Sequence, residues 1–103
     1  MIHVIATIQA APGRRAELLR EFRVLLPQVR AELGCIEYGP TIDLATQIAA
    51  QPPPRPDVVV MIEKWQDLAA LEAHLAAPHM TAFRAKVKDL VANIQIQVFE
   101  PSL

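Results

Sequence analysis

Side chains that can handle protons are concentrated in residues 58–88 of this 103-residue chain. An apolar run, VVVMI, leads to Glu63 and Trp65, and His74 and His79 follow shortly afterwards. Imidazole and carboxylate groups can take up or release protons near neutral pH when their surroundings are tuned for it. The pattern therefore predicts an apolar pocket that holds a few proton-handling groups.

His74 is the first candidate for a base. It belongs to an expected helix, 67–76, in which Leu68, Leu71 and Leu75 form an apolar stripe. His74 falls at the edge of that stripe, where half-burial favours the neutral form of the ring. The alternative interpretation is a boundary histidine that hydrogen-bonds a backbone carbonyl group.

Glu63 and Trp65 are two residues apart on an expected strand, so their side chains share one face. They can converge with His74 because a short turn joins the strand to the helix. We then expect Glu63 to orient the imidazole of His74. In the alternative, Glu63 pairs with a cation such as Lys64 or Arg84, and Trp65 is simply a core residue.

Five further residues are candidates for binding a small aromatic molecule. His79 stands in the first turn of an expected helix, where the positive end of the helix dipole favours a neutral ring. Tyr38 can offer a phenol to a substrate oxygen. Phe22, Met80 and Phe83 are expected in the core first and in the pocket wall second. Alternatively, His79 is a capping or surface residue and Tyr38 packs at a sheet edge.

Other classes of site find little support in the sequence. The spacing of His74 and His79 does not match the i, i+4 pair of a zinc-protease helix, so no metal is expected. The three glycines lie far apart, which argues against a phosphate-binding loop and against a bound nucleotide or flavin. The single cysteine, Cys35, has no basic neighbour in sequence and is expected to be an inert apolar residue.

The composition also limits the partners. A net charge of −1, with both signs interspersed, argues against binding to nucleic acid or to an anionic membrane surface. No apolar run reaches the roughly 18–20 residues of a membrane span, and the start lacks the charged region of a secretory signal. A lone cysteine suits a reducing compartment, so we expect a cytoplasmic protein.

Hydrophobic periodicity predicts one domain, 1–103, with a β-α-β-β-α-β order. Strands are expected at 2–10, 35–45, 58–65 and 93–100, and helices at 14–33, at 67–76 and from 78 to about 90. This order is that of the ferredoxin-like split βαβ arrangement, an α+β fold with an antiparallel sheet. The strand at 58–65 is apolar on both faces, which is typical of a central strand.

Several residues mark breaks in these elements. Pro27 is expected to kink the first helix or to end it a turn early. Gly34 is suited to the left-handed conformation that terminates a helix. Gly39-Pro40 is expected to break or bulge the second strand, and the prolines of residues 51–56 (QPPPRP) exclude regular structure there.

The predicted sheet has helices on one face only. Hydrophobic residues make up 52% of the chain, more than one small core hides, and the second faces of the strands carry few charges. A sheet of this kind favours a partner sheet. We therefore expect a homodimer that packs sheet face to sheet face, as a dimeric α+β barrel.

On these residues the chain resembles the antibiotic biosynthesis monooxygenase superfamily, and within it the small quinol monooxygenases of bacteria. The resemblance covers nearly the whole chain, in the segments IHVIATI, GCIEYGP, VVVMIEKW, LEAHLAAPHMTAF and VKDLVANIQIQVFEP. The EKW strand end and the paired helices around HLAAPHMTAF are its most specific parts.

The resemblance implies a dimeric α+β barrel with a pocket between helices and sheet in each subunit. It also implies oxygenation of a quinol or polycyclic phenolic compound with O2, without flavin, haem or metal. By residue type at matching positions, it gives His74 and Trp65 as the main catalytic residues, followed by Glu63, Tyr38 and His79.

Three hypotheses follow. In the first, a cofactor-independent monooxygenase, His74 removes a phenolic proton in a dry chamber and Trp65, Tyr38 or His79 donates to the developing oxyanion. The second is a non-enzymatic dimer of the same fold that binds a small aromatic ligand. The third, haem binding and degradation, is less favoured because the haem-degrading members carry an asparagine on the first strand, whereas the only asparagine here is Asn93.

Overall fold

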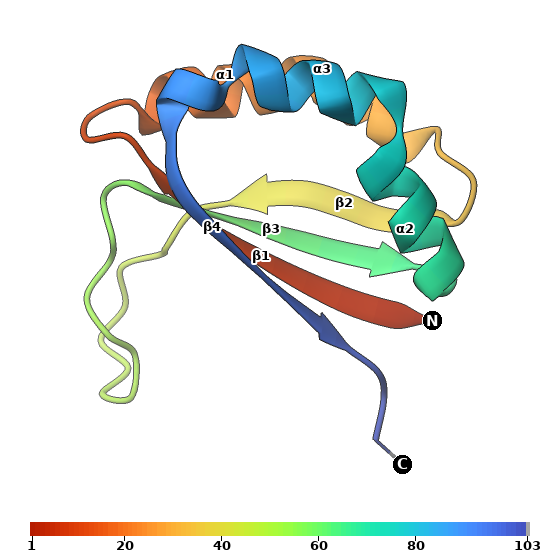
Figure 1. The fold of residues 1–103 in the computed structure, drawn as a ribbon. Coiled ribbons are helices and arrows are strands. Elements are labelled where there is room, and N and C mark those ends of the chain that lie inside the picture. The colour runs from red at the N-terminus through yellow and green to blue at the C-terminus, as the bar shows by residue number, and fades with distance from the viewer. Residues whose placement is uncertain (103) are drawn as a thin grey trace.

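The computed structural model describes residues 1–102 as two layers, with helices over one face of a four-stranded sheet (Figure 1). Neighbouring strands are antiparallel, in the order β2-β3-β1-β4. The predicted ferredoxin-like α+β fold is confirmed. The elements are β1 (Ile2–Ala10), α1 (Arg15–Arg30), β2 (Cys35–Thr41), β3 (Val58–Trp65), α2 (Leu68–Ala76), α3 (Pro78–Lys86), a 3-10 turn (Lys88–Leu90) and β4 (Val91–Phe99).

The core lies between the central strands and the helices. β1 and β3 are the inner pair, as expected for the apolar strand at 58–65. Alternate residues of both strands point toward the helices, because side chains alternate between the two faces of a strand. Helix α1 covers them with one stripe of side chains at helical spacing, as its sequence predicts. The fully buried members of this core include Val4, Ala10, Leu18, Val29, Val59, Met61 and Trp65.

β2 ends at Thr41 and is therefore shorter than predicted. The break expected at Gly39-Pro40 is wrong, since both residues keep their pairing with β3. The irregularity lies instead between Cys35 and Glu37. Proline is tolerated in this ladder because β2 is an edge strand, and one of its sides needs no backbone N–H donor.

Gly34 fixes the connection between α1 and β2. Helix α1 ends at Arg30, soon after Pro27 and about a turn before its predicted end, as a proline inside the helix should cause. Gly34 then adopts φ +83°, and a Cβ atom added there would lie 2.6 Å from the Cβ of Ala70. Its carbonyl oxygen accepts a hydrogen bond of 2.8 Å from the backbone N–H of Gln66, which ties the loop to the start of α2.

Helix α2 buries a narrower stripe than predicted. Asp67 caps its start by accepting a backbone hydrogen bond of 2.9 Å. Leu71 and His74 are buried, whereas Leu68 and Leu75 are 53% and 38% exposed, so the predicted leucine stripe is wrong. The helix is only nine residues long and packs at one end of the sheet, so a single line of side chains reaches the core.

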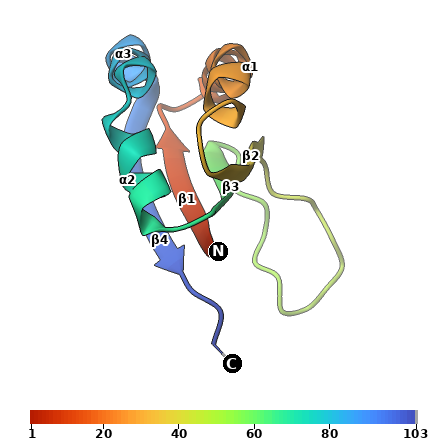
Figure 2. The same ribbon diagram turned by 90° about the vertical axis from the view of Figure 1, so that its right-hand side faces the viewer.

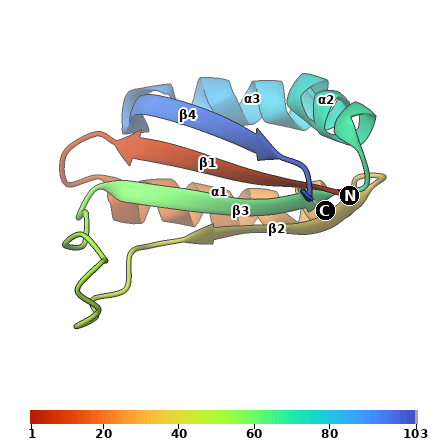
Figure 3. The same cartoon turned by 90° about the horizontal axis from the view of Figure 1, so that it is seen from below.

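Among the described residues, no helix covers the second face of the sheet (Figure 3). The loop 42–57 extends from the end of β2 toward this uncovered side before it returns to β3 (Figures 1 and 2). Its proline tract forms no regular structure, as predicted, and a salt bridge of 2.8 Å between Asp43 and Arg55 closes its base. No helix within residues 1–102 is long and apolar enough to cross a membrane.

Candidate active site

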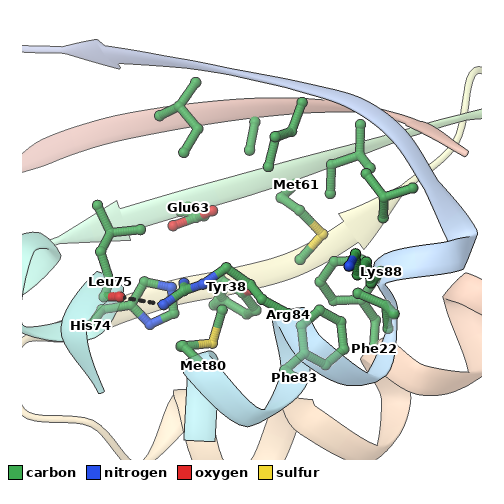
Figure 4. A pocket seen from close by; sticks show the side chains of 16 residues that line it. Phe22, Tyr38, Met61, Glu63, His74, Leu75, Met80, Phe83, Arg84 and Lys88 are labelled. Carbon is green, nitrogen blue, oxygen red and sulfur yellow. Dashed lines mark hydrogen bonds between the residues drawn. The ribbon is translucent and has the colours of Figure 1, made fainter. Parts of the chain in front are cut away.

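A cavity of about 410 Å³ lies between the helices and the sheet. Figure 4 shows Met61 and Glu63 on its strand side and Met80 and Phe83 on its helix side. Its walls are mostly apolar, as is usual for a site that takes a small molecule. Six of the eight predicted site residues line it: Phe22, Tyr38, Glu63, His74, Met80 and Phe83.

His74 is the most enclosed polar residue of the cavity wall, with 2% of its surface exposed. The sequence placed it at a half-buried edge, but it lies within the buried stripe of α2. The rings of Trp65 and Tyr38 stand beside it, with centroids 4.7 Å and 5.4 Å from the imidazole. These aromatic neighbours fix the plane of the ring and remove water from around it.

The two ring nitrogens of His74 differ in their surroundings. Nδ1 is 2.9 Å from Oε2 of Glu32, a carboxylate oxygen that accepts a hydrogen bond from a protonated ring nitrogen. Nε2 has no hydrogen-bond partner among residues 1–102. Every fully buried side-chain nitrogen or oxygen in those residues does have a partner, so Nε2 is not fully buried. Nε2 therefore stays accessible, from the cavity that His74 lines. With the proton held on Nδ1, Nε2 presents a lone pair to that cavity.

Glu32 is the functional residue that sequence reasoning missed. It lies 42 residues from His74 in the chain, so no local spacing links the two side chains. One signal was available: an acidic residue just after the end of α1 faces the negative end of the helix dipole and needs a donor partner. The prediction that Glu63 orients His74 is wrong, because Glu32 occupies that position.

Glu63 binds Trp65 instead. The indole N–H donates a buried hydrogen bond of 2.9 Å to Oε1 of Glu63, as the two side chains leave β3 on the same face. Burial raises the pKa of Glu63 to about 7, and the indole hydrogen bond opposes that rise only in part. Trp65 is fully buried and is not part of the cavity wall, and it contacts both Glu63 and the ring of His74.

The raised pKa of Glu63 predicts a pH-dependent stability. Between pH 4.5, its ordinary pKa, and about 7, the folded chain binds more protons at this carboxyl than the unfolded chain. The free energy of unfolding should therefore fall as the pH rises through that window, by up to roughly 3 kcal/mol. Urea unfolding from pH 4.5 to 8 measures it. Glu63→Gln should flatten this slope, and an unchanged slope in that variant would contradict the assignment.

Tyr38 offers a phenol to the cavity. Burial, followed by the nearby carboxylates of Glu63 and Glu32, raises the pKa of Tyr38 well above its ordinary value of 10. The side chain therefore remains a protonated hydrogen-bond donor throughout the physiological range. Its position in the cavity wall, beside His74, agrees with the predicted contact to a substrate oxygen.

His79 does not reach the cavity, in contrast to the predicted substrate contact. Its Nε2 is 2.8 Å from the same Oε2 of Glu32 that binds His74, and the ring lines a separate surface hollow between α1 and α3. Glu32 thus joins the two histidines. Their three ligand atoms lie within 4.8 Å of one another, so these residues could hold a metal ion.

Two cationic residues lie at the cavity, where sequence reasoning did not place them. Arg84 and Lys88 are part of its wall, and Nη2 of Arg84 donates to the carbonyl oxygen of Leu75 at 2.8 Å, the contact dashed in Figure 4. No pattern in the sequence distinguishes them from solvated helix residues. They supply positive charge close to an otherwise apolar chamber.

Comparison with known proteins agrees with this architecture. The family model for antibiotic biosynthesis monooxygenases matches residues 1–86. The chain belongs to that family. The resemblance of its sequence segments to this group is confirmed, and a monooxygenase is the class of activity that membership supports.

Individual relatives of this monooxygenase family cover the chain almost end to end. The probable quinol monooxygenase YgiN of Escherichia coli is 40% identical over 105 residues, which include all of both chains. YcnE of Bacillus subtilis is 35% identical over 92 residues, 89% of this chain and 87% of YcnE. The crystal structure of PA3566 from Pseudomonas aeruginosa has a TM-score of 0.79 and 34% identity, covering 99% of this chain and 94% of PA3566.

Proposed function

We propose that the chain is a cofactor-independent monooxygenase that acts on a quinol or polycyclic phenol with O2, with His74 as the base. The single observation that carries the proposal is the state of that imidazole. Its Nδ1 is held by Glu32, while its Nε2 is open to an apolar cavity of about 410 Å³. An imidazole oriented through one nitrogen, beside an aromatic-sized chamber, is suited to remove a phenolic proton. The monooxygenase family and the quinol monooxygenase relative agree with this substrate class.

The reaction needs no external reductant. Nε2 of His74 accepts the phenolic proton, and the electron-rich anion then passes one electron to O2. The resulting substrate radical and superoxide combine at a ring carbon, and loss of water from that adduct leaves a hydroxyquinone. Overall, the quinol and O2 give a hydroxyquinone and water, so the four electrons that O2 takes up all come from the quinol. The proton that His74 accepted ends in the water molecule that is formed, which restores the base.

The protein's contribution to the later steps is electrostatic. Tyr38 stays protonated and can donate to the substrate oxygen, and Arg84 adds positive charge at the cavity wall. The indole of Trp65 is already bound to Glu63, so we assign it a supporting role in place of the oxyanion contact predicted from sequence. Phe22, whose ring centroid lies 4.8 Å from that of Phe83, helps to form the apolar wall against a flat substrate.

Oxygen uptake with a panel of anaerobically reduced naphthoquinols tests the proposal. The protein is first freed of metal and flavin, and its rate is compared with the autoxidation rate of each quinol. Uptake above autoxidation, with a hydroxylated product, is the expected result. Tight binding of the quinols without uptake would overturn it in favour of a non-enzymatic binder of aromatic ligands.

We also propose that the chain forms a homodimer through the uncovered face of the sheet, as a dimeric α+β barrel. Ile5 and Phe99 are 39% and 43% exposed, and strand register places them on the face opposite the helices. The loop 42–57 extends on the same side, with Leu44 and Ile48 exposed, so it can contact the second copy. A cytoplasmic location suits the unpaired Cys35.

A charge on that face should prevent the association. Ile5→Glu would bury an unpaired charge from each copy in an otherwise apolar interface, which costs several kcal/mol. We expect the wild type to sediment as a dimer and this variant as a monomer in analytical ultracentrifugation. Val24→Glu, the same change at a residue that is 68% exposed on α1, is the control and should remain dimeric. A monomeric wild type, or a dimeric Ile5→Glu variant, would refute the interface.

A further inference from the structure

We infer that Glu32, His74 and His79 form a binding site for a divalent transition metal, of which Zn²⁺ is the best fit, and that the bound metal blocks the base. The second part rests on the proposed function. The site joins three segments that are far apart in the chain: the loop after α1, the last turn of α2 and the first turn of α3. The proposed oxygenation uses the contact of Glu32 with His74, but it has no use for the second contact, of Glu32 with His79.

The donor set selects the class of metal. Two imidazole nitrogens and one carboxylate oxygen are the ligands of many three-residue zinc sites, which leave a fourth position for water. Mg²⁺ and Ca²⁺ prefer six or more oxygen ligands, which these residues do not provide. Nitrogen-rich sites of this kind favour Zn²⁺ and its neighbours Co²⁺, Ni²⁺ and Cu²⁺.

The distances are close to those of an occupied site. Oε2 of Glu32 lies 2.9 Å from Nδ1 of His74 and 2.8 Å from Nε2 of His79. In a tetrahedral zinc site with bonds of about 2.0–2.1 Å, neighbouring ligand atoms are about 3.4 Å apart. Each of these two contacts must therefore lengthen by about half an ångström. The two ring nitrogens, which lie within 4.8 Å of each other, must come to about 3.4 Å, so binding requires rotation of the histidine side chains.

The site also has an entry path for an ion. The side chains of His74, Glu32 and His79 are 3%, 13% and 23% exposed, so the cluster is open to solvent on the side of His79. His79 lines the surface hollow between α1 and α3, through which an ion can reach Glu32.

Occupancy would change the chemistry of His74. A metal on Nδ1 takes the place of the proton that now faces Glu32, and a neutral ring must then carry its proton on Nε2. Nε2 is the atom that the cavity reaches, and with a proton attached it donates a hydrogen bond and no longer accepts a proton. The metal is therefore expected to inhibit turnover and not to assist it.

Calorimetric titration of the chelator-treated full chain with ZnCl2 tests the site. We expect one ion per chain with an affinity in the micromolar range or tighter, weakened at least about tenfold by Glu32→Gln and by His79→Gln. His3→Gln, on the uncovered face of the sheet, is the matched control and should bind as the wild type does. Absence of one-to-one binding, or equal binding in the Glu32 and His79 variants, would overturn the inference.

Two spectra keep the test valid if a variant fails to fold. Co²⁺ in the wild type should give the strong visible absorption of a tetrahedral ion, and long-range ¹H–¹⁵N spectra should show Zn²⁺ shifting Nδ1 of His74 and Nε2 of His79. Shifts at His3 alone would refute the site. Oxygen uptake is read separately: if Zn²⁺ binds by these criteria but leaves quinol turnover unchanged, the metal site stands and the role of His74 as the base fails.

Discussion

Replacing His74 with alanine is expected to lower oxygen uptake with naphthoquinols by at least about 100-fold, the contribution of a positioned general base. The substitution removes the only ring nitrogen that lies open to the cavity among the described histidines, since His79 faces a separate hollow and His3 belongs to the outer face of β1. Binding of the oxidised quinone should weaken far less, because the apolar wall is left intact. Stopped-flow uptake and ligand titration separate these two effects.

Controls for this variant address its burial. His74 is packed against Trp65 and Tyr38, so loss of activity must be distinguished from loss of structure. His74→Gln retains a polar side chain of comparable length, and its circular dichroism and unfolding midpoint should match the wild type more closely while turnover stays low. His3→Ala should be fully active. Turnover that survives in folded His74→Ala would remove the imidazole from the mechanism.

Gly34→Ala is expected to destabilise the protein by roughly 2–5 kcal/mol. A residue with a side chain at φ +83° is strained by roughly 1–2 kcal/mol. The added Cβ would also lie 2.6 Å from the Cβ of Ala70, and relieving that overlap should cost a further 1–3 kcal/mol, roughly the usual cost of overpacking. The free energy of unfolding in urea measures the sum.

Gly13→Ala separates these two contributions. Gly13 has a similar backbone angle, φ +75°, but nothing lies within 4 Å of an added Cβ. Its variant should lose only the backbone part, roughly 1–2 kcal/mol. Equal losses at the two positions would contradict the packing role of Gly34. Because Gly34 follows Glu32 closely, Gly34→Ala should also misplace that carboxylate and lower activity beyond the effect on stability.

The fold was largely predictable because local rules and tertiary structure agree in this chain. Alternation of apolar residues located β1, and helical spacing of Leu18, Phe22, Leu25 and Val29 located the buried face of α1. The errors occurred where the neighbours of an element decide the outcome. Pro40 remains in β2 because that strand lies at the edge of the sheet, a position that the residues of β2 alone did not establish.

The site was predictable only in part, for a related reason. His74 and Glu63 were found because residue type and burial can be inferred over a few residues of sequence. Glu32 could not be found from spacing, since its contact with His74 is made by the way the end of α1 packs beside α2 and α3. Partner choice among buried polar groups depends on distances between elements, so the wrong carboxylate was assigned to the imidazole.

The cavity has one fixed end and one adaptable end. Around His74, aromatic rings and a shared carboxylate restrain every side chain, whereas Ile94 and Ile96 on the edge strand β4 line the chamber while 51% and 45% exposed. Substitutions at these two isoleucines can reshape the opening with little cost to folding, because their side chains are only half packed. Variants of this chain can therefore change the range of compounds that enter the cavity without altering the residues around His74.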